Sequence, residues 1–253
     1  MTSPDHSTAA ALATAAGELL LQVRSRAFDD AGARKAAGDG ESHRFLVARL
    51  AELQPDDAVL SEEGADDPVR LVSDRVWIVD PLDGTREFSE PGRADWAVHV
   101  ALWERGELVA GAVALPAAGL TLGTGGGHPV PARAGGPVRL AVSRSRPPAL
   151  VQALAARLGA RLVPMGSAGV KAMSVVRGET DAYVHGGGQY EWDSAAPVAV
   201  ARAAGLHASR LDGSALRYNR PDPYLPDLLI CRPELADELL SALAEQPGEH
   251  QPG

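Results

Sequence analysis

The sequence contains a single cysteine, Cys231, so it can build neither an internal disulfide nor a site of several thiolates. Basic residues are also in deficit: 24 lysines and arginines stand against 33 aspartates and glutamates, a formal net charge of −9. This balance disfavours sequence-independent binding to nucleic acid, which needs a basic surplus. An anionic substrate would need metal ions or a local basic cluster, and a metal would need oxygen or imidazole ligands.

Long hydrophobic runs are absent as well. No stretch approaches the roughly 18 apolar residues that span a bilayer, and residues 1–10 lack the basic and apolar segments of a secretory signal. We therefore expect a cytoplasmic protein with no membrane segment. With 253 residues, of which 45% are hydrophobic, the chain can form one large domain or two small ones around a shared core.

The first half of the sequence has the pattern of two helices followed by antiparallel strands. Apolar residues recur at helical spacing over 12–23, and again over 45–53 after a helix start predicted at 40–42. Short apolar stretches follow, and tight turns separate the last of them, which favours an antiparallel meander. These stretches lie at 58–60, 75–79, 96–103, 108–115 and 120–122.

From residue 138 onward, strands and helices alternate, which indicates an α/β arrangement with helices covering a sheet. Strands are expected at 138–142, 161–163, 182–184, 207–209 and 228–231, and helices at 148–158, 167–176, 194–204 and 233–244. The Gly- and Pro-rich stretch at 123–137 precedes the change and is the predicted boundary. We expect an N-terminal α+β half at 1–135, a C-terminal α/β half at 136–253, and an active site between them.

Two carboxylates follow the strand at 75–79, in the sequence Asp-Pro-Leu-Asp-Gly-Thr at 80–85. Pro81 has no N–H to donate, so we expect the strand to end there. Hard divalent cations such as Mg²⁺ prefer a few carboxylate oxygens together with water, which suits Asp80 and Asp83, and the carbonyl of Leu82 could complete the set. Taken alone, the same sequence is ordinary turn chemistry.

Acidic residues also occur at the ends of three other predicted elements. Glu62 and Glu63 follow a short strand, Asp193 precedes a helix of small residues, and Asp39 lies between two glycines before a predicted helix. Each has an ordinary explanation as a solvated loop, a helix cap or a turn. Together, the four groups favour a shared metal site over four coincidences.

These acidic residues and their neighbours resemble, in order, the inositol monophosphatase superfamily of lithium-sensitive, magnesium-dependent phosphatases. The resemblance runs from about residue 12 to residue 244 and includes Gly166-Ser167 and the Trp-Asp-Ser-Ala-Ala-Pro sequence at 192–197. It implies a layered αβαβα sandwich, a phosphoric monoester hydrolase, and two or three Mg²⁺ ions that Mn²⁺ can replace. The implied metal ligands are Glu62, Asp80, the Leu82 carbonyl, Asp83 and Asp193. The implied pair that activates the attacking water is Asp39 and Thr85.

The continuation Arg86-Glu87-Phe88 resembles the branch that removes the 3'-phosphate of 3'-phosphoadenosine 5'-phosphate, giving AMP and phosphate in sulfate assimilation. The expected substrate contacts are Gly84, Thr85, Arg86, Ser167, Lys171 and Asp193. Further candidates are Arg144, Arg146 and Arg217 for a second phosphate and Tyr218 for stacking on the base. A solvated surface charge is the ordinary alternative for each arginine, and a half-buried position for Tyr218.

Several alternatives stay open at this level. The substrate could be an inositol 1-phosphate or fructose 1,6-bisphosphate, or the chain could be a non-catalytic sensor of a phosphorylated nucleotide. The expected ligand is a small phosphate ester, a phosphorylated nucleotide or a sugar phosphate. Neither nucleic acid nor a membrane is an expected partner, and the chain could form a homodimer. The glycines at 123–127 and 186–188 are expected in flexible turns, because no Gly-Lys-Ser/Thr follows them. His99 and His185 are expected to be hydrogen-bonded sheet residues and not ligands.

Overall fold

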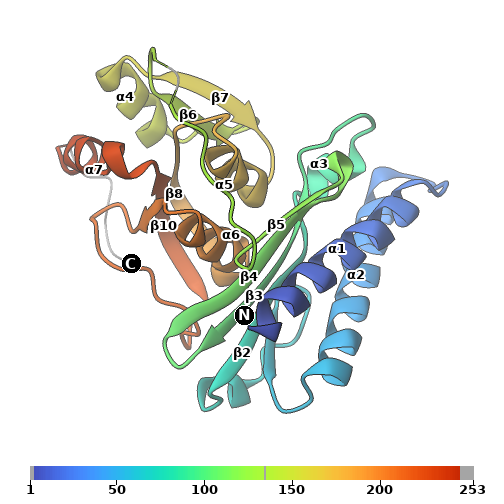
Figure 1. The fold of residues 1–253 in the computed structure, drawn as a ribbon. Helices are drawn as coiled ribbons and strands as arrows, with labels where there is room; N and C mark the ends of the chain where they lie inside the picture. The colour runs from blue at the N-terminus through green and yellow to red at the C-terminus, as the bar shows by residue number, and fades with distance from the viewer. Residues whose placement is uncertain (1–2, 134, 246–253) are drawn as a thin grey trace.

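The computed structural model describes residues 3–133 and 135–245 of the chain. Within them, two five-stranded sheets alternate with three layers of helices (Figure 1). One helix pair packs on the outer face of the first sheet, a second pair fills the space between the sheets, and a third pair packs on the outer face of the second sheet. The predicted layered αβαβα sandwich is confirmed.

The first helical layer consists of α1, Pro4–Arg24, and α2, Ala31–Leu53. Side chains cap both helices at their N-termini: Ser3 Oγ accepts from the N–H of Asp5, and the Asp30 carboxylate accepts from the N–H of Ala33 at 2.7 Å. Their apolar faces share a core with one face of the first sheet, including the fully buried Trp77.

The helix start predicted at residues 40–42 is wrong, because α2 begins at Ala31 and runs through Asp39. Glycine weakens a helix interior, which made the glycines on either side of Asp39 look like a boundary. Gly38 is required by close packing instead: a Cβ there would lie 2.7 Å from Cε1 of Phe88 and 2.8 Å from Cδ2 of Leu82. This contact brings the middle of α2 against the segment that follows the Asp-Pro-Leu-Asp sequence.

The first sheet has the order β1-β2-β3-β4-β5, with β1 parallel to β2 and the remaining neighbours antiparallel, so the predicted meander is confirmed. The strand bounds are Ala58–Ser61, Arg75–Asp83, Ala97–Glu104, Glu107–Leu115 and Leu120–Gly123. One prediction was wrong: β2 does not end at Pro81. The pairing of β2 with β3 slips between Asp80 and Asp83, and Pro81 lies in this irregularity, where its missing N–H costs no ladder bond. The short helix α3, Thr85–Ser89, follows at once.

The second sheet has the order β7-β6-β8-β10-β9. In chain order, the bounds of β6 to β10 are Arg139–Ser143, Arg161–Met165, Ala182–Tyr190, His207–Ser209 and Tyr224–Cys231. Strand β6 runs parallel to β7 and β8, and β10 runs antiparallel to β8 and β9. The glycines at 186–188 were predicted in a flexible turn, but they lie within β8. At Gly188 a Cβ would meet the hydroxyl of Tyr224 at 2.3 Å, so the strand carries glycine where a neighbouring ring approaches.

The remaining helices cover the two faces of this sheet. Helices α5, Ala168–Val176, and α6, Glu191–Ala203, lie between the sheets, while α4, Ala149–Leu158, and α7, Ala236–Ala244, pack on the outer face. Three short 3-10 turns complete the described elements, at Pro68–Leu71, Pro116–Ala118 and Pro233–Leu235. The division of the chain near residue 135 remains a prediction.

Candidate active site

Three aspartates from different elements meet between the sheets. Asp80 and Asp83 come from the irregular end of β2, and Asp193 comes from the first turn of α6. One carboxylate oxygen of each lies within 4.8 Å of the other two. Asp80 and Asp83 are buried, so their charges are poorly screened. Asp193 was expected just before its helix; it is the third residue of α6, and its carboxylate accepts the N–H of Tyr190 at 2.7 Å.

A fourth carboxylate, Glu62, joins this cluster from the end of β1 and shares a hydrogen bond with Asp80. Partial desolvation and the Asp193 charge raise the pKa of Glu62 to about 7, although the residue keeps an exposed side. Desolvation and the Asp83 charge raise the pKa of Asp193 to about 6, and burial with Glu62 raises that of Asp80 well above its usual range. Four mutually repelling carboxylates make an all-oxygen donor set that fits a hard divalent cation.

Asp83 differs from the other three because donors of the protein surround it. Ser167 Oγ donates to it, the N–H groups of Ala168 and Gly169 donate at 3.0 and 2.6 Å, and Nε2 of His99 lies 3.1 Å away. Burial alone would raise the pKa of Asp83, but His99 and these hydrogen bonds outweigh it and lower the pKa to about 2. The carboxylate therefore ties the end of β2 to the start of α5.

His99 is a buried, hydrogen-bonded sheet histidine, as predicted. Its Nδ1 lies 3.0 Å from the carbonyl oxygen of Trp192, which can only accept, and its Nε2 faces Asp83. Burial lowers the pKa of His99, but the Asp83 charge outweighs this and the net shift is upward. Gly169 is essential to this contact, because a Cβ there would lie 2.1 Å from His99 Nε2.

The structure also brings Asp39 and Thr85 together. Asp39 lies in the middle of α2 and Thr85 opens α3; the Thr85 hydroxyl hydrogen-bonds to the Asp39 carboxylate and lies 3.4 Å from the carbonyl oxygen of Leu82. Desolvation and the nearby Glu63 raise the pKa of Asp39 to about 6. This carboxylate and hydroxyl stand at one side of the acidic cluster, as a pair that could orient a small polar molecule.

A cleft of about 620 Å³ opens beside the cluster. Asp83, Gly84, Ser167 and Asp193 line it, and all four were predicted as site residues from the sequence. Lys171 also lines the cleft; it is buried, its Nζ lies 5.3 Å from the ring centre of Tyr183, and burial lowers its pKa. The remaining lining residues are Ser143, Arg146, Pro148, Ala168, Tyr183, Val184, His185, Gly186, Gly187, Gly188, Gln189 and Tyr190.

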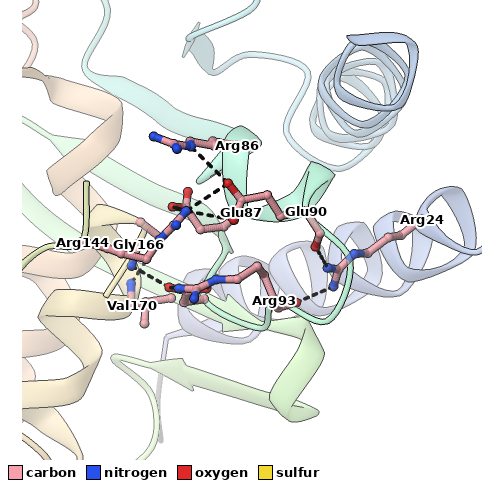
Figure 2. Close-up of polar contacts among 10 residues, drawn as sticks. Arg24, Arg86, Glu87, Glu90, Arg93, Arg144, Gly166 and Val170 are labelled. Atoms are coloured by element: carbon pink, nitrogen blue, oxygen red, sulfur yellow. Dashed lines mark hydrogen bonds and ion pairs between the residues drawn. The ribbon is translucent and has the colours of Figure 1, made fainter. Parts of the chain in front are cut away.

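Other basic candidates are engaged elsewhere. Arg86 is exposed and pairs with Glu90 at 3.1 Å, and Arg144 reaches across from the second half of the chain to Glu87 at 2.7 Å and to Glu90 at 3.0 Å (Figure 2). Neither is among the residues that line the cleft. Arg217 is exposed.

Tyr218 is fully packed and more buried than expected. Its hydroxyl lies 3.2 Å from that of Ser194, so the ring cannot stack on a substrate base in this position.

Sequence reasoning missed the wall of the cleft that β8 forms. Tyr183, Gln189 and Tyr190 drew no attention, because the glycines between them suggested that the strand had ended. The sequence offered no signal for this wall, because the polar Gln189 is buried and the aromatic Tyr190 is exposed, the reverse of what hydrophobicity predicts.

A fold of alternating sheets and helices with an acidic cluster at its centre is the architecture expected from the resemblance, and the comparison with known families agrees. The model described as the inositol monophosphatase family matches residues 2–248. The chain belongs to the inositol monophosphatase family.

Individual proteins of this family are similar to the chain over most of its length. A protein of Mycobacterium tuberculosis named 3'-phosphoadenosine 5'-phosphate phosphatase is 56% identical over 239 residues, covering 91% of this chain and 90% of the relative. The protein of the same name from Mycobacterium leprae is 52% identical over 95% of this chain and 94% of the relative. Among solved structures, CysQ from Bacteroides thetaiotaomicron is similar, with a TM-score of 0.77 and 28% identity over 89% of this chain and 96% of the other.

In the part of the chain that the structure describes, no helix combines the length and the apolar character that a bilayer crossing requires.

Proposed function

We propose that this chain is a metal-dependent phosphatase that removes the 3'-phosphate of 3'-phosphoadenosine 5'-phosphate, giving AMP and inorganic phosphate. The observation that carries the proposal is the identity of 56% over almost the whole chain to a relative of that name. The acidic cluster, the Asp39–Thr85 pair and the adjoining cleft supply the groups that such a reaction needs. This hydrolysis would serve sulfate assimilation, by removing the bisphosphate that arises there.

Two or three Mg²⁺ ions would bind, and Mn²⁺ could take their place. Their ligands would be Glu62, Asp80, the Leu82 carbonyl, Asp83 and Asp193. The fit of these ions rests on the all-oxygen donor set and on the desolvation and mutual repulsion that raise the pKa of Glu62, Asp80 and Asp193. When bound, the ions would neutralise the charge on the phosphate and acidify water. They would also relieve the repulsion among the carboxylates.

Asp39 and Thr85 would position the attacking water. The hydroxyl of Thr85 is held by its hydrogen bond to Asp39. A lone pair of its oxygen can therefore accept a hydrogen bond from the attacking water, and the Asp39 carboxylate is next to it as the acceptor of the proton that this water loses. The water would attack phosphorus directly, the bond to the ribose 3'-oxygen would break, and that oxygen would take up a proton.

The phosphate and the rest of the nucleotide would lie in the cleft. The amides of Gly84 and Thr85 and the hydroxyl of Ser167 would contact the phosphate near the carboxylates. Lys171 and Arg146, which line the same cleft, would face the second phosphate. Arg86 would act only if it left its pair with Glu90.

Phosphate release from 3'-phosphoadenosine 5'-phosphate tests the proposal directly. We expect turnover in Mg²⁺, loss of turnover with a chelator, and recovery when Mg²⁺ is returned. The catalytic efficiency on this substrate should exceed that on inositol 1-phosphate and on fructose 1,6-bisphosphate. Higher efficiency on either of those would move the chain to the alternative substrate, and binding without any phosphate release would make it a sensor.

A further inference from the structure

The wall of the cleft formed by β8 carries a chain of hydrogen bonds that the proposed reaction does not use. Nε2 of His185 lies 2.9 Å from the carbonyl oxygen of Gly188, and Nδ1 of His185 lies 3.3 Å from the hydroxyl of Tyr183. Nε2 of Gln189 lies 2.8 Å from that same hydroxyl. All four residues line the cleft.

Only one arrangement of protons satisfies this chain. The Gly188 carbonyl can only accept, so the hydrogen of His185 must be on Nε2. Burial lowers the pKa of His185 and keeps the ring neutral, which leaves Nδ1 as an acceptor. Tyr183 must therefore donate its hydrogen to Nδ1, and its oxygen is free to accept from the amide nitrogen of Gln189.

The direction of these hydrogen bonds fixes the orientation of the Gln189 amide. Its nitrogen is held against Tyr183, so its oxygen, Oε1, is the end left over. The Gln189 side chain is only 7% exposed, and no group in residues 3–133 or 135–245 donates to Oε1. A buried acceptor without a donor is costly, which makes this oxygen a position that a ligand donor would fill.

The surroundings indicate which ligand group that is. Tyr183 lies close enough to the acidic cluster that, after desolvation, the charges of Asp83 and Asp193 raise its pKa. The ammonium group of the buried Lys171 lies over the ring of Tyr183. Gln189 contacts Tyr183 and lines the same cleft as Asp83 and Asp193, a position that suits a substituent on the sugar carbon next to the reacting phosphate.

We propose that Gln189 is a specificity-determining residue that accepts a hydrogen bond from the hydroxyl on the carbon next to the phosphate-bearing carbon, which is the 2'-hydroxyl of the ribose. Tyr183 and His185 are positioning residues, because they act through the orientation of the Gln189 amide. The inference rests on the proposed function, since it takes the substrate to be a 3'-phosphorylated ribonucleotide.

The test compares two substrates in two proteins: 3'-phosphoadenosine 5'-phosphate and 2'-deoxyadenosine 3',5'-bisphosphate, in the wild type and in Gln189→Met. The wild type should prefer the ribose substrate roughly tenfold in kcat/KM, the value for one hydrogen bond to a buried acceptor. In Gln189→Met this ratio should fall toward one, mainly through loss on the ribose substrate.

Equal losses on both substrates, or an unchanged ratio, would overturn the proposal. A third substrate, 3'-phosphoinosine 5'-phosphate, lacks the amino group of adenine. The proposal would also be overturned if Gln189→Met changed only the ratio of kcat/KM between the adenosine and inosine substrates, because the partner of Gln189 would then be that amino group. Failure of the wild type to release phosphate from either substrate would instead refute the proposed function.

Tyr183→Phe supplies an independent variant that keeps Oε1 but releases the amide. We expect the ribose-to-deoxyribose ratio to shrink partway, because the amide can then rotate and present its nitrogen. If Gln189→Met does not fold, this variant decides the question, and an unchanged ratio in a folded Tyr183→Phe protein would overturn the proposal.

Discussion

At the scale of single residues, Asp83 and Asp193 share a cluster but have opposite relations to the protein around them. Asp83 accepts from Ser167, Ala168 and Gly169, whereas Asp193 accepts one backbone N–H, and its burial and the Asp83 charge outweigh the attraction of His99 and Lys171. Both substitutions with asparagine should reduce turnover by orders of magnitude. In chelator, however, Asp83→Asn should lower the free energy of unfolding by about 2 kcal/mol, because an amide cannot accept from all these donors.

Asp193→Asn should have the opposite effect on stability in chelator, since it removes a repelling charge and its amide oxygen can still accept from Tyr190. Thermal unfolding of the two variants beside the wild type measures this contrast. Equal destabilisation by both would mean that the donors around Asp83 contribute little.

The raised carboxyl pKa values predict how stability depends on pH without metal. Asp39, Glu62 and Asp193 have folded-state pKa values of about 6, 7 and 6, above those of an unfolded chain. Their ionisation therefore opposes folding, and stability should rise as the pH falls from 8 to 6. Saturating Mg²⁺ should flatten this dependence. Melting temperatures with chelator and with Mg²⁺ test it, and a metal-free protein that is most stable at pH 8 would contradict it.

Thr85 offers a residue-scale test of water activation. Thr85→Ala should lower kcat by roughly 10²- to 10⁴-fold with little change in the Mg²⁺ concentration that half-saturates the enzyme. Thr85→Ser keeps the hydroxyl and should restore most of the activity. Should excess Mg²⁺ rescue Thr85→Ala instead, Thr85 would belong to metal binding.

At the scale of the element, α2 shows how packing overrides helix propensity. Gly38→Ala adds a good helix former, yet its Cβ would clash with Phe88 and Leu82, so we expect a loss of about 1–3 kcal/mol in unfolding free energy and displacement of Asp39. Gly40→Ala is the matched control: its Cβ would meet only the flexible end of Arg44 at 3.2 Å, so stability should hold or rise by up to about 1 kcal/mol. Chemical denaturation distinguishes the pair, and equal effects would refute the packing argument.

The elements also show what the sequence can and cannot predict. Hydrophobic periodicity identified the strands of both sheets, because each buries one or both faces and its pattern is local. It failed at Gly38 and at Gly188, where the reason for glycine is a side chain distant in the sequence: Phe88 in one case and Tyr224 in the other. The acidic residues were found because they lie at strand and helix ends. The Gln189 wall was missed because its role depends on an amide orientation that only contacts define.

At the scale of the whole molecule, α3 is one of the places where residues before and after the predicted boundary near residue 135 contact each other. Arg144 binds Glu87 of α3 and Glu90, the residue that follows α3 (Figure 2). The N–H of Gly166 donates to Asp95, a few residues beyond α3, at 2.6 Å. Glu87 is buried, so Arg144→Ala would leave its carboxylate without this cation. The melting temperature should fall clearly more than in Arg86→Ala, which removes an exposed pair with Glu90. Equal melting temperatures would show that this contact between the halves is dispensable.

The acidic cluster combines residues of the first sheet with Asp193 of α6, far along the chain, and this has a consequence for how the protein is made. Asp80 and Asp83 leave the ribosome long before Asp193, so a nascent chain that ends ahead of α6 holds only part of the acidic cluster proposed to bind the metal. Such a chain would lack Asp193, and in a chain that also ends before α5 the carboxylate of Asp83 would lack the N–H groups of Ala168 and Gly169. If the proposed ligands hold the metal, metal loading would therefore follow the synthesis of α6 and be a late event of biosynthesis.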